Sequence, residues 1–160
     1  MKHLSGLNFA ALWALALLCF RNPWWVLPTV RATRECIRVC NLHYGKQHHR
    51  NTAANAFRHA LWNYYIARAC YKGKSNLDNV LRWAAKFTNW HEDFSKNPPL
   101  ARKMDLHNNA VGRALFKENP HLKTEEVITL LKQKAEASLK ISKIEEMEAI
   151  GSTGFVHLKD

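Results

Sequence analysis

Apolar residues recur along most of this chain at intervals of three and four, a spacing that places them on one face of an α-helix. The pattern predicts helices over 30–44, 52–71, 76–94, 100–116 and 124–140, separated by residues that favour turns. Thr29 is expected to cap the first of these helices and Gly45 to end it. A short strand is expected at 155–158. Together these elements predict an all-α fold, a single compact bundle of about five to six helices.

The helix predicted at 52–71 carries polar side chains where apolar ones would be expected. Asn55, His59 and Asn63 are four residues apart, so all three lie along one stripe. The rest of this helix is so apolar that the stripe is expected to be buried, and buried polar groups need partners. Other helices should therefore supply polar side chains that face it.

The helix predicted at 76–94 changes from apolar to polar along its inward face. That face begins with Leu77 and Leu81 and ends with Thr88, His91 and Glu92. A change of this kind can set a polar site into a hydrophobic core. We therefore expect the end of this helix to face the polar stripe.

The helix predicted at 100–116 supplies a second polar face, made by Asp105, Asn108, Asn109 and Gly112. A glycine costs a helix up to about 1 kcal/mol relative to alanine, so a close helix approach or a ligand is expected at Gly112. His107 lies about 200° around the helix from Asp105. Whether Asp105 or His107 faces inward is left open.

Residues 1–28 form an apolar N-terminal segment, followed by a helical domain at 29–160. The apolar run from Leu7 to Phe20 would be about 21 Å long as a helix, shorter than the roughly 30 Å hydrocarbon core of a bilayer. Trp24 and Trp25 suit a membrane interface, and the arginines that follow favour the cytoplasmic side. We expect membrane association with the main domain in the cytoplasm. The alternatives are an exported protein with an N-terminal signal, or a helix packed on the core.

Composition points to an anionic partner. The chain of 160 residues has a formal net charge of +11 at pH 7. Such a charge attracts lipid headgroups, nucleic acid or phosphate-bearing substrates. The alternative is that the charge serves only solubility. His48 and His49 are expected in a solvated basic loop. The four cysteines are expected to be small buried residues rather than a disulfide framework: Cys19, Cys36, Cys40 and Cys70.

The polar residues of the three helices predict a hydrolytic site. Four residues are both candidate catalytic groups and candidate ligands for a divalent metal such as Zn²⁺ or Mn²⁺: His59, His91, Glu92 and Asp105. Five more are expected to orient the substrate: Arg58, Asn63, Asn108, Asn109 and Arg113. A metal-free version would use His59 as the general base. No recognised metal signature and no Gly-rich phosphate loop is present in the sequence.

Three motifs resemble an uncharacterised bacterial helical family, a domain of unknown function that also occurs at the ends of toxin-like and wall-associated proteins. The motifs are FRHALWN at 57–63, HE at 91–92 and MDLHNNAVGR at 104–113, within a motif core of 44–116. The resemblance implies a shared site, without naming a reaction, at Arg58, His59, Trp62, Asn63, His91, Glu92, Asp105, Asn108, Asn109, Gly112 and Arg113.

The leading hypothesis is a membrane-associated helical domain with a metal-dependent hydrolase-like site for a phosphate ester such as a phospholipid. Its expected partner is an anionic membrane surface. One alternative is a non-catalytic, membrane-associated interaction module with a structural buried polar network. A second alternative is a nuclease-like toxin domain, which would need a basic groove leading to the polar residues. The apolar N-terminal segment disfavours nucleic acid as a partner.

Overall fold

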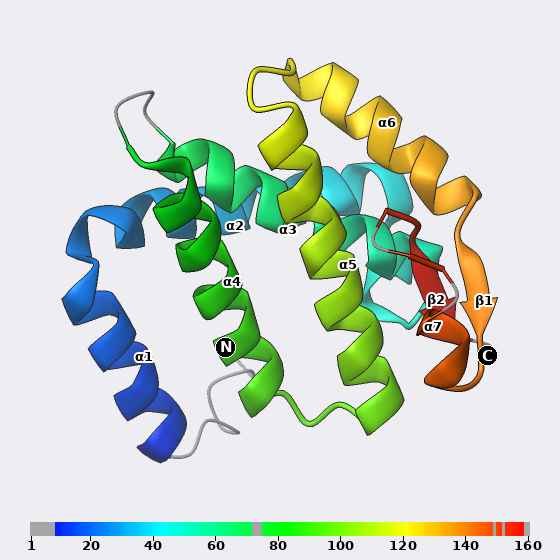
Figure 1. Ribbon diagram of the computed structural model, residues 1–160, viewed down its shortest axis with the longest axis horizontal. Helices are drawn as coiled ribbons and strands as arrows, with labels where there is room; N and C mark the ends of the chain where they lie inside the picture. The colour runs from blue at the N-terminus through cyan, green and yellow to red at the C-terminus, as the bar shows by residue number, and fades with distance from the viewer. Residues whose placement is uncertain (1–8, 72–74, 149, 152, 159–160) are drawn as a thin grey trace.

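The computed structural model describes residues 9–71, 75–148, 150–151 and 153–158, and within them the chain forms a helical bundle with one small sheet (Figure 1). The predicted all-α fold is confirmed. The elements in chain order are α1 (Phe9–Arg21), α2 (Pro23–Tyr44), the 3₁₀ turn η1 (Gln47–His49), α3 (Ala53–Cys70), α4 (Leu77–Phe94), α5 (Pro99–Glu118), α6 (Thr124–Glu136), β1 (Leu139–Ile141), α7 (Glu145–Glu148) and β2 (Val156–Leu158). The start of the predicted apolar run, at Leu7, lies outside the described residues.

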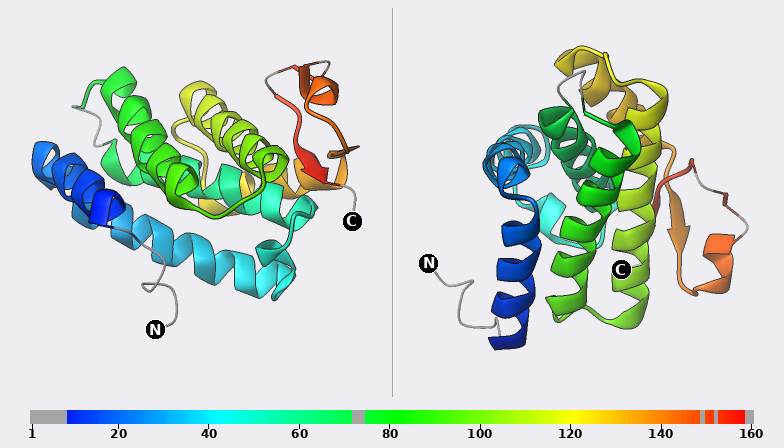
Figure 2. Two further views of the ribbon diagram at one scale, coloured as in Figure 1. Left: turned by 90° about the horizontal axis from the view of Figure 1, so that it is seen from below. Right: turned by 60° about the vertical axis from the view of Figure 1, so that its left-hand side comes forward.

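Helix α3 is the centre of the bundle. It packs most extensively against α5 and α2, and it also contacts α4 and α6 (Figures 1 and 2). Of its 18 residues, 13 are buried, so the buried side chains of α3 lie on most of its circumference and not along a single stripe. The polar residues on α3 are therefore enclosed by the rest of the fold.

Helices α3 and α5 approach each other closely at Gly112. A Cβ atom placed on Gly112 would lie 2.6 Å from the Cα atom of Ala60, a distance that real Cβ atoms do not adopt. The close helix approach that the sequence suggested for Gly112 is thus present. It brings α5 near enough for its side chains to reach α3.

Helix α2 begins earlier than expected. It starts at Pro23 and continues through Pro28, so Thr29 is a buried residue inside the helix and does not cap it. Proline is tolerated in the first turn of a helix, where Pro23 stands. Tertiary contacts hold this part of the helix, because Thr29 Oγ1 accepts a hydrogen bond of 2.8 Å from Trp83 Nε1 of α4.

Helix α6 ends at Glu136, so its predicted extension to 140 is wrong. Residues Leu139–Ile141 instead form β1, which pairs in parallel with β2, and β2 lies where a strand was expected. Parallel strands are joined by a long connection, here through α7. The pattern of one short segment cannot reveal such a distant partner.

Helix α1 leans against one side of the bundle and meets α2 at a sharp bend (Figure 1). None of the described helices is by itself long and apolar enough to span a bilayer. The pair formed by α1 and α2 passes such a test by length and composition, but the two helices are bent by 116°.

Candidate metal centre

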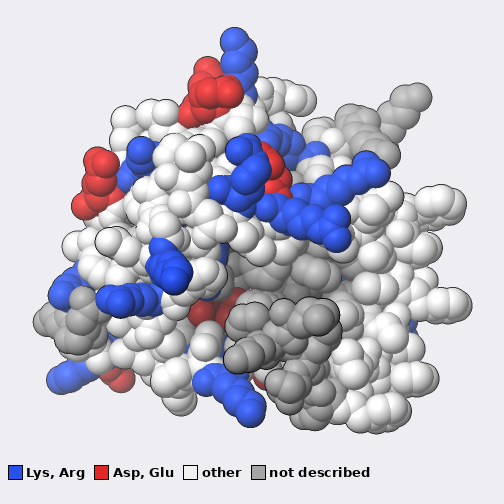
Figure 3. Space-filling view, turned by 180° about the vertical axis from the view of Figure 1, so that it is seen from behind, with Lys and Arg blue, Asp and Glu red and all other residues white. Residues whose placement is uncertain are grey.

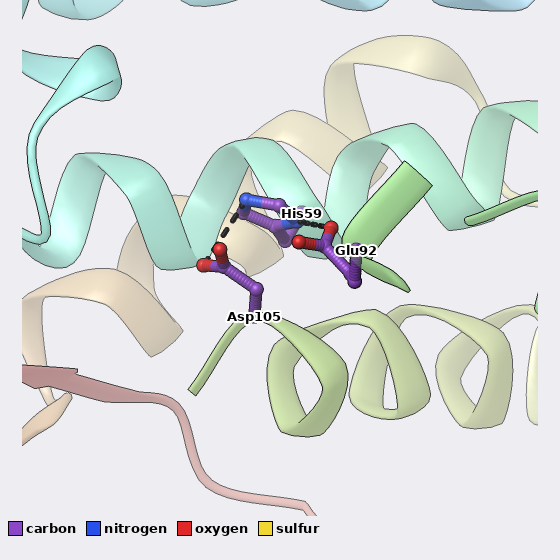
Figure 4. Close-up of side chains that lie close together, drawn as sticks. All are labelled: His59, Glu92 and Asp105. Atoms are coloured by element: carbon purple, nitrogen blue, oxygen red, sulfur yellow. Dashed lines mark ion pairs between the residues drawn. The ribbon is translucent and has the colours of Figure 1, made fainter. Parts of the chain in front are cut away.

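Three acidic and imidazole side chains from three helices converge in the core (Figure 4). His59 comes from α3, Glu92 from the last turn of α4, and Asp105 from the first half of α5. Each offers one ligand atom, and these atoms lie within 4.8 Å of one another. None of the three residues is more than 2 % exposed. The group could hold a metal ion.

The imidazole of His59 stands between the two carboxyl groups. Its Nδ1 atom is 3.5 Å from Glu92 Oε1, and its Nε2 atom is 3.2 Å from Asp105 Oδ1 (Figure 4). On the Nδ1 side, the Asn109 carbonyl oxygen lies at 3.1 Å and accepts the ring proton. On the Nε2 side, an Arg58 nitrogen lies at 2.8 Å. Because a guanidinium only donates, Nε2 carries the lone pair and is the ring nitrogen available to a cation.

The distance between Nε2 and Asp105 Oδ1 suits two ligands of one ion. Atoms that each lie about 2.0–2.2 Å from a shared ion are roughly 3 Å apart, and the observed distance is 3.2 Å. Two oxygens of the group, Glu92 Oε2 and Asp105 Oδ1, have no hydrogen-bond partner although they are buried. Buried polar atoms are normally paired, so these two acceptors lack either protons or a cation.

The shifted pKa values of the three residues also favour binding of a cation. Burial and the neighbouring Asp105 raise the pKa of Glu92 to about 8. Burial raises the pKa of Asp105 to about 7, against the opposing effect of the Arg58 charge. Burial, followed by the charge of Arg58, lowers the pKa of His59 well below its ordinary value. At neutral pH the cluster therefore combines a neutral imidazole with carboxyl groups that retain protons, which a divalent cation would displace.

A second set of side chains holds this group in place from behind. Asn63 donates to Asn109 Oδ1 at 2.6 Å and accepts at 2.7 Å from the Arg113 guanidinium. Its oxygen also accepts from Thr88 Oγ1 at 3.2 Å. Asn109 in turn donates to Glu92 Oε1 at 3.5 Å. Asn63 and Arg113 therefore position Asn109, and Asn109 orients both His59 and Glu92.

A pocket of about 150 Å³ lies on the outer side of Arg58. It is lined by residues of α2, η1, α3 and α4: Thr33, Cys36, Ile37, His48, His49, Arg58, Trp62 and His91. Arg58 lines this pocket and also contacts His59 through its guanidinium, so one residue links the pocket to the buried group. The wall of the pocket is mostly apolar, although three histidines and Arg58 are among the residues that line it.

His48 is buried in η1 and lines this pocket, so the expected solvated position holds only for His49. Its Nε2 atom is 2.9 Å from the Asn41 side-chain oxygen and donates to it. Its Nδ1 atom has no hydrogen-bond partner. Burial, followed by the charges of His49 and Arg58, lowers the pKa of His48 to about 4, so Nδ1 remains an acceptor at neutral pH.

Residues 16–139 match a protein family described as a domain of unknown function (DUF6973). The chain belongs to this family. The match includes all three helices that build the centre, in agreement with the resemblance seen in the motifs. No curated protein matches the chain, and no solved structure matches it.

In this DUF6973 domain the structure separates the predicted site residues into two groups. His59, Glu92 and Asp105 come together, with Arg58 and Asn109 in direct contact with His59. His91 lies outside the group: its exposed ring packs edge-on against Trp62, with ring centroids 5.2 Å apart. The two adjacent residues point in different directions from α4, so Glu92 faces the group and His91 lines the pocket.

Asn108 also lies away from the site. Its side-chain amide donates to the Val156 carbonyl at 2.9 Å and accepts from the Val156 N–H at 3.1 Å, so it holds β2 against α5. His107 bonds the Gly154 carbonyl at 2.8 Å. The open question between Asp105 and His107 is thereby answered, because Asp105 faces the centre and His107 holds the C-terminal segment.

One contact of the centre had no signal in the sequence. Asn97 donates to Asp105 Oδ2 at 3.0 Å from the loop between α4 and α5. The sequence predicted only a loop at 95–99, because of Pro98 and Pro99, and Pro99 in fact begins α5. An asparagine in such a loop usually serves the turn itself, so its contact with a buried carboxyl depends on how the loop folds back over α5.

Proposed function

We propose that this protein is a metal-dependent hydrolase that cleaves phosphate esters, with His59, Glu92 and Asp105 as the metal ligands. One observation carries the proposal: His59, Glu92 and Asp105 each offer one ligand atom within 4.8 Å of the others, and two carboxyl oxygens of this buried group have no hydrogen-bond partner. Zn²⁺ and Mn²⁺ suit this mixture of one nitrogen and two oxygen ligands.

The charges of the site favour an anionic substrate. A divalent ion would balance the two carboxylates, and Arg58 would then leave one positive charge facing the pocket. The Arg58 guanidinium now contacts Nε2 of His59 at 2.8 Å, and a cation held by that nitrogen would leave the guanidinium without this partner. It can then bind two oxygens of a phosphate group in the planar geometry that guanidinium offers.

The reaction follows from these positions. The ion would acidify a bound water and polarise the phosphate. Glu92 Oε2, which has no other partner, would take the proton as the water oxygen bonds to phosphorus. The ester P–O bond then breaks, and the departing alcohol oxygen receives that proton. Ile37, Cys36 and Trp62 of the pocket wall would contact the apolar part of the alcohol.

The first test is metal binding. After dialysis against Zn²⁺ or Mn²⁺, elemental analysis should find about one ion per wild-type chain. Glu92→Gln and Asp105→Asn keep the shape of each side chain and should lose the ion. The matched controls Asp93→Asn and His121→Asn alter exposed residues outside the centre and should retain it. Ion-free wild-type protein, or equal ion content in Glu92→Gln, would contradict the proposed centre.

The second test is hydrolysis of p-nitrophenyl phosphate and bis(p-nitrophenyl) phosphate by the metal-loaded protein. Arg58→Ala should lower the turnover by about 10²–10³-fold, as expected when a group that stabilises transition-state charge is lost. The same variant should keep its metal, because Arg58 is not a ligand. If the protein binds the ion but hydrolyses neither ester, the proposed metal centre stands and the proposed phosphate ester hydrolysis is contradicted.

A structural role for the polar residues is the second candidate, and the fully paired Asn63 side chain favours it. The two roles differ in what Glu92→Gln does to the metal-free protein. A structural network should lose about 1–3 kcal/mol of unfolding free energy when one partner changes. If the residues form a metal centre, metal-free Glu92→Gln should instead be more stable than metal-free wild type, because glutamine removes a carboxyl group whose ionised form burial disfavours. Denaturant titration in EDTA decides between them.

A further inference from the structure

The outward side of α1 and the first turns of α2 exposes large apolar side chains. The most exposed of them are Phe9 (82 %), Phe20 (85 %) and Trp24 (88 %), together with Trp13 and Leu27. The opposite side of α1 is held by the domain, because Ala11 is buried and its carbonyl accepts a hydrogen bond of 3.0 Å from Trp90 of α4. The apolar ridge is therefore a face that the described part of the bundle leaves uncovered.

The charged residues within α1 and the first turns of α2 have one sign. Residues 1–34 contain no Asp or Glu, while Arg21, Arg31 and Arg34 are exposed along the same two helices. In Figure 3 the α1 side of the molecule, on the right, is almost entirely uncharged, and Lys and Arg gather on the neighbouring surface. Exposed apolar aromatic residues that share their two helices with arginines fit an apolar layer beneath negative headgroups.

The geometry fits a helix that lies in the membrane surface. α1 has 13 residues, which makes it about 20 Å long and too short for a hydrocarbon core of roughly 30 Å. The bend of 116° directs α2 away from α1, back along the domain. Trp13 and Trp24 lie on the exposed side, and tryptophan prefers the level of the headgroups.

We propose that the face formed by Phe9, Trp13, Phe20, Trp24 and Leu27 docks in the plane of an anionic lipid bilayer. The apolar side chains enter the boundary of the acyl chains, and Arg21, Arg31 and Arg34 bind headgroup phosphates. This inference does not depend on the reaction proposed for the buried group, because it concerns a separate surface and is tested by binding alone.

The test is co-sedimentation of the full chain with vesicles of phosphatidylcholine alone or of phosphatidylcholine mixed with phosphatidylglycerol. Wild-type protein should sediment with the anionic vesicles, less at high salt, and far less with the neutral ones. The double variant Trp13→Ser/Phe20→Ser should bind at least about tenfold more weakly, because it removes two large apolar groups from the boundary. Arg31→Ser/Arg34→Ser should bind more weakly and lose most of the salt dependence.

The matched control is Leu42→Ser/Leu139→Ser, which removes two exposed leucines from other parts of the surface and should bind as the wild type does. Circular dichroism verifies that each variant is folded. Folded wild-type protein that stays in the supernatant with both kinds of vesicle would overturn the inference. A wild-type dimer that Trp13→Ser/Phe20→Ser converts to monomer would also overturn it, since a second copy would then cover the face.

Discussion

At the scale of single residues, His59 is the side chain that the other residues of the centre contact. Asn109 accepts the proton of Nδ1, which leaves the Nε2 lone pair facing Asp105 and Arg58. Two ionised carboxyl groups beside one neutral imidazole and the Arg58 charge would leave the cluster with a net negative charge. Protons balance this charge in the metal-free protein, and an ion would replace them.

The raised carboxyl pKa values predict how the stability of the metal-free protein depends on pH. Between about pH 6.5 and 8, folded Glu92 and Asp105 still hold protons that the unfolded chain has lost, so the unfolded state binds fewer protons. The free energy of unfolding should therefore fall by about 2 kcal/mol as the pH rises through this window. His59 and His48, whose pKa values are lowered, act with the opposite sign but only below about pH 6.5.

Denaturant titrations in EDTA at several pH values measure this slope. Glu92→Gln should make the slope shallower, because its side chain has no proton to lose and only Asp105 still titrates, while the exposed neighbour Asp93→Asn should leave it unchanged. A slope of the same size in Glu92→Gln and the wild type would show that the centre does not hold the titrating protons.

At the scale of elements, the close packing of α3 on α5 sets the geometry of the site. His59 lies one residue before Ala60, whose backbone faces Gly112, so the position of the imidazole depends directly on how near α5 comes. Asn108, three residues after Asp105, ties the same helix to β2. Helix α5 is therefore held on one side by α3 and on the other by the C-terminal strand.

Gly112→Ala should separate these two helices. Its Cβ would meet the backbone of Ala60, which cannot rotate away, so we expect a loss of about 3 kcal/mol or more in unfolding free energy. Metal affinity should fall as well, because Asp105 would move away from His59. The comparison is Ala110→Gly, an exposed change on the same helix that should cost only about 1 kcal/mol and leave metal binding intact. Full stability in Gly112→Ala would contradict the role given to this contact.

At the scale of the whole molecule, the centre joins helices that are distant in sequence. An ion bound by His59, Glu92 and Asp105 would tie α3, α4 and α5 together at a point deep in the bundle. The unfolded chain does not keep these three residues close, so an ion that binds the folded state alone must stabilise it.

Thermal unfolding should show this coupling. Zn²⁺ or Mn²⁺ at about a hundred times its dissociation constant adds about 2.7 kcal/mol of stability, or roughly 5–10 °C in Tm for a domain of this size. At one fixed ion concentration the increase in Tm should be larger at pH 8 than at pH 6.5, because the ion competes with the carboxyl protons and binds more weakly at the lower pH. EDTA should reverse it. Asp105→Asn should show no increase, and an increase equal to that of the wild type would place the ion elsewhere.

The periodicity of the sequence was sufficient to predict the helical class and most helix positions. Apolar spacing reports which side of a helix is buried, and the stripe of Asn55, His59 and Asn63 stands out because polar groups there need partners. All three of these residues are indeed buried. Local turn residues also marked most of the helix ends.

Only the tertiary structure decided which residues form the centre. His91 and Glu92 are adjacent, and the rotation of α4 against α3 turns Glu92 inward and His91 outward. The partner of Asn108 is a strand that begins 48 residues later, and the pairing of β1 with β2 depends on the same distant return of the chain. Periodicity along one helix carries no information on its rotation about its own axis or on what packs against it, because both are set by contacts between segments remote in sequence.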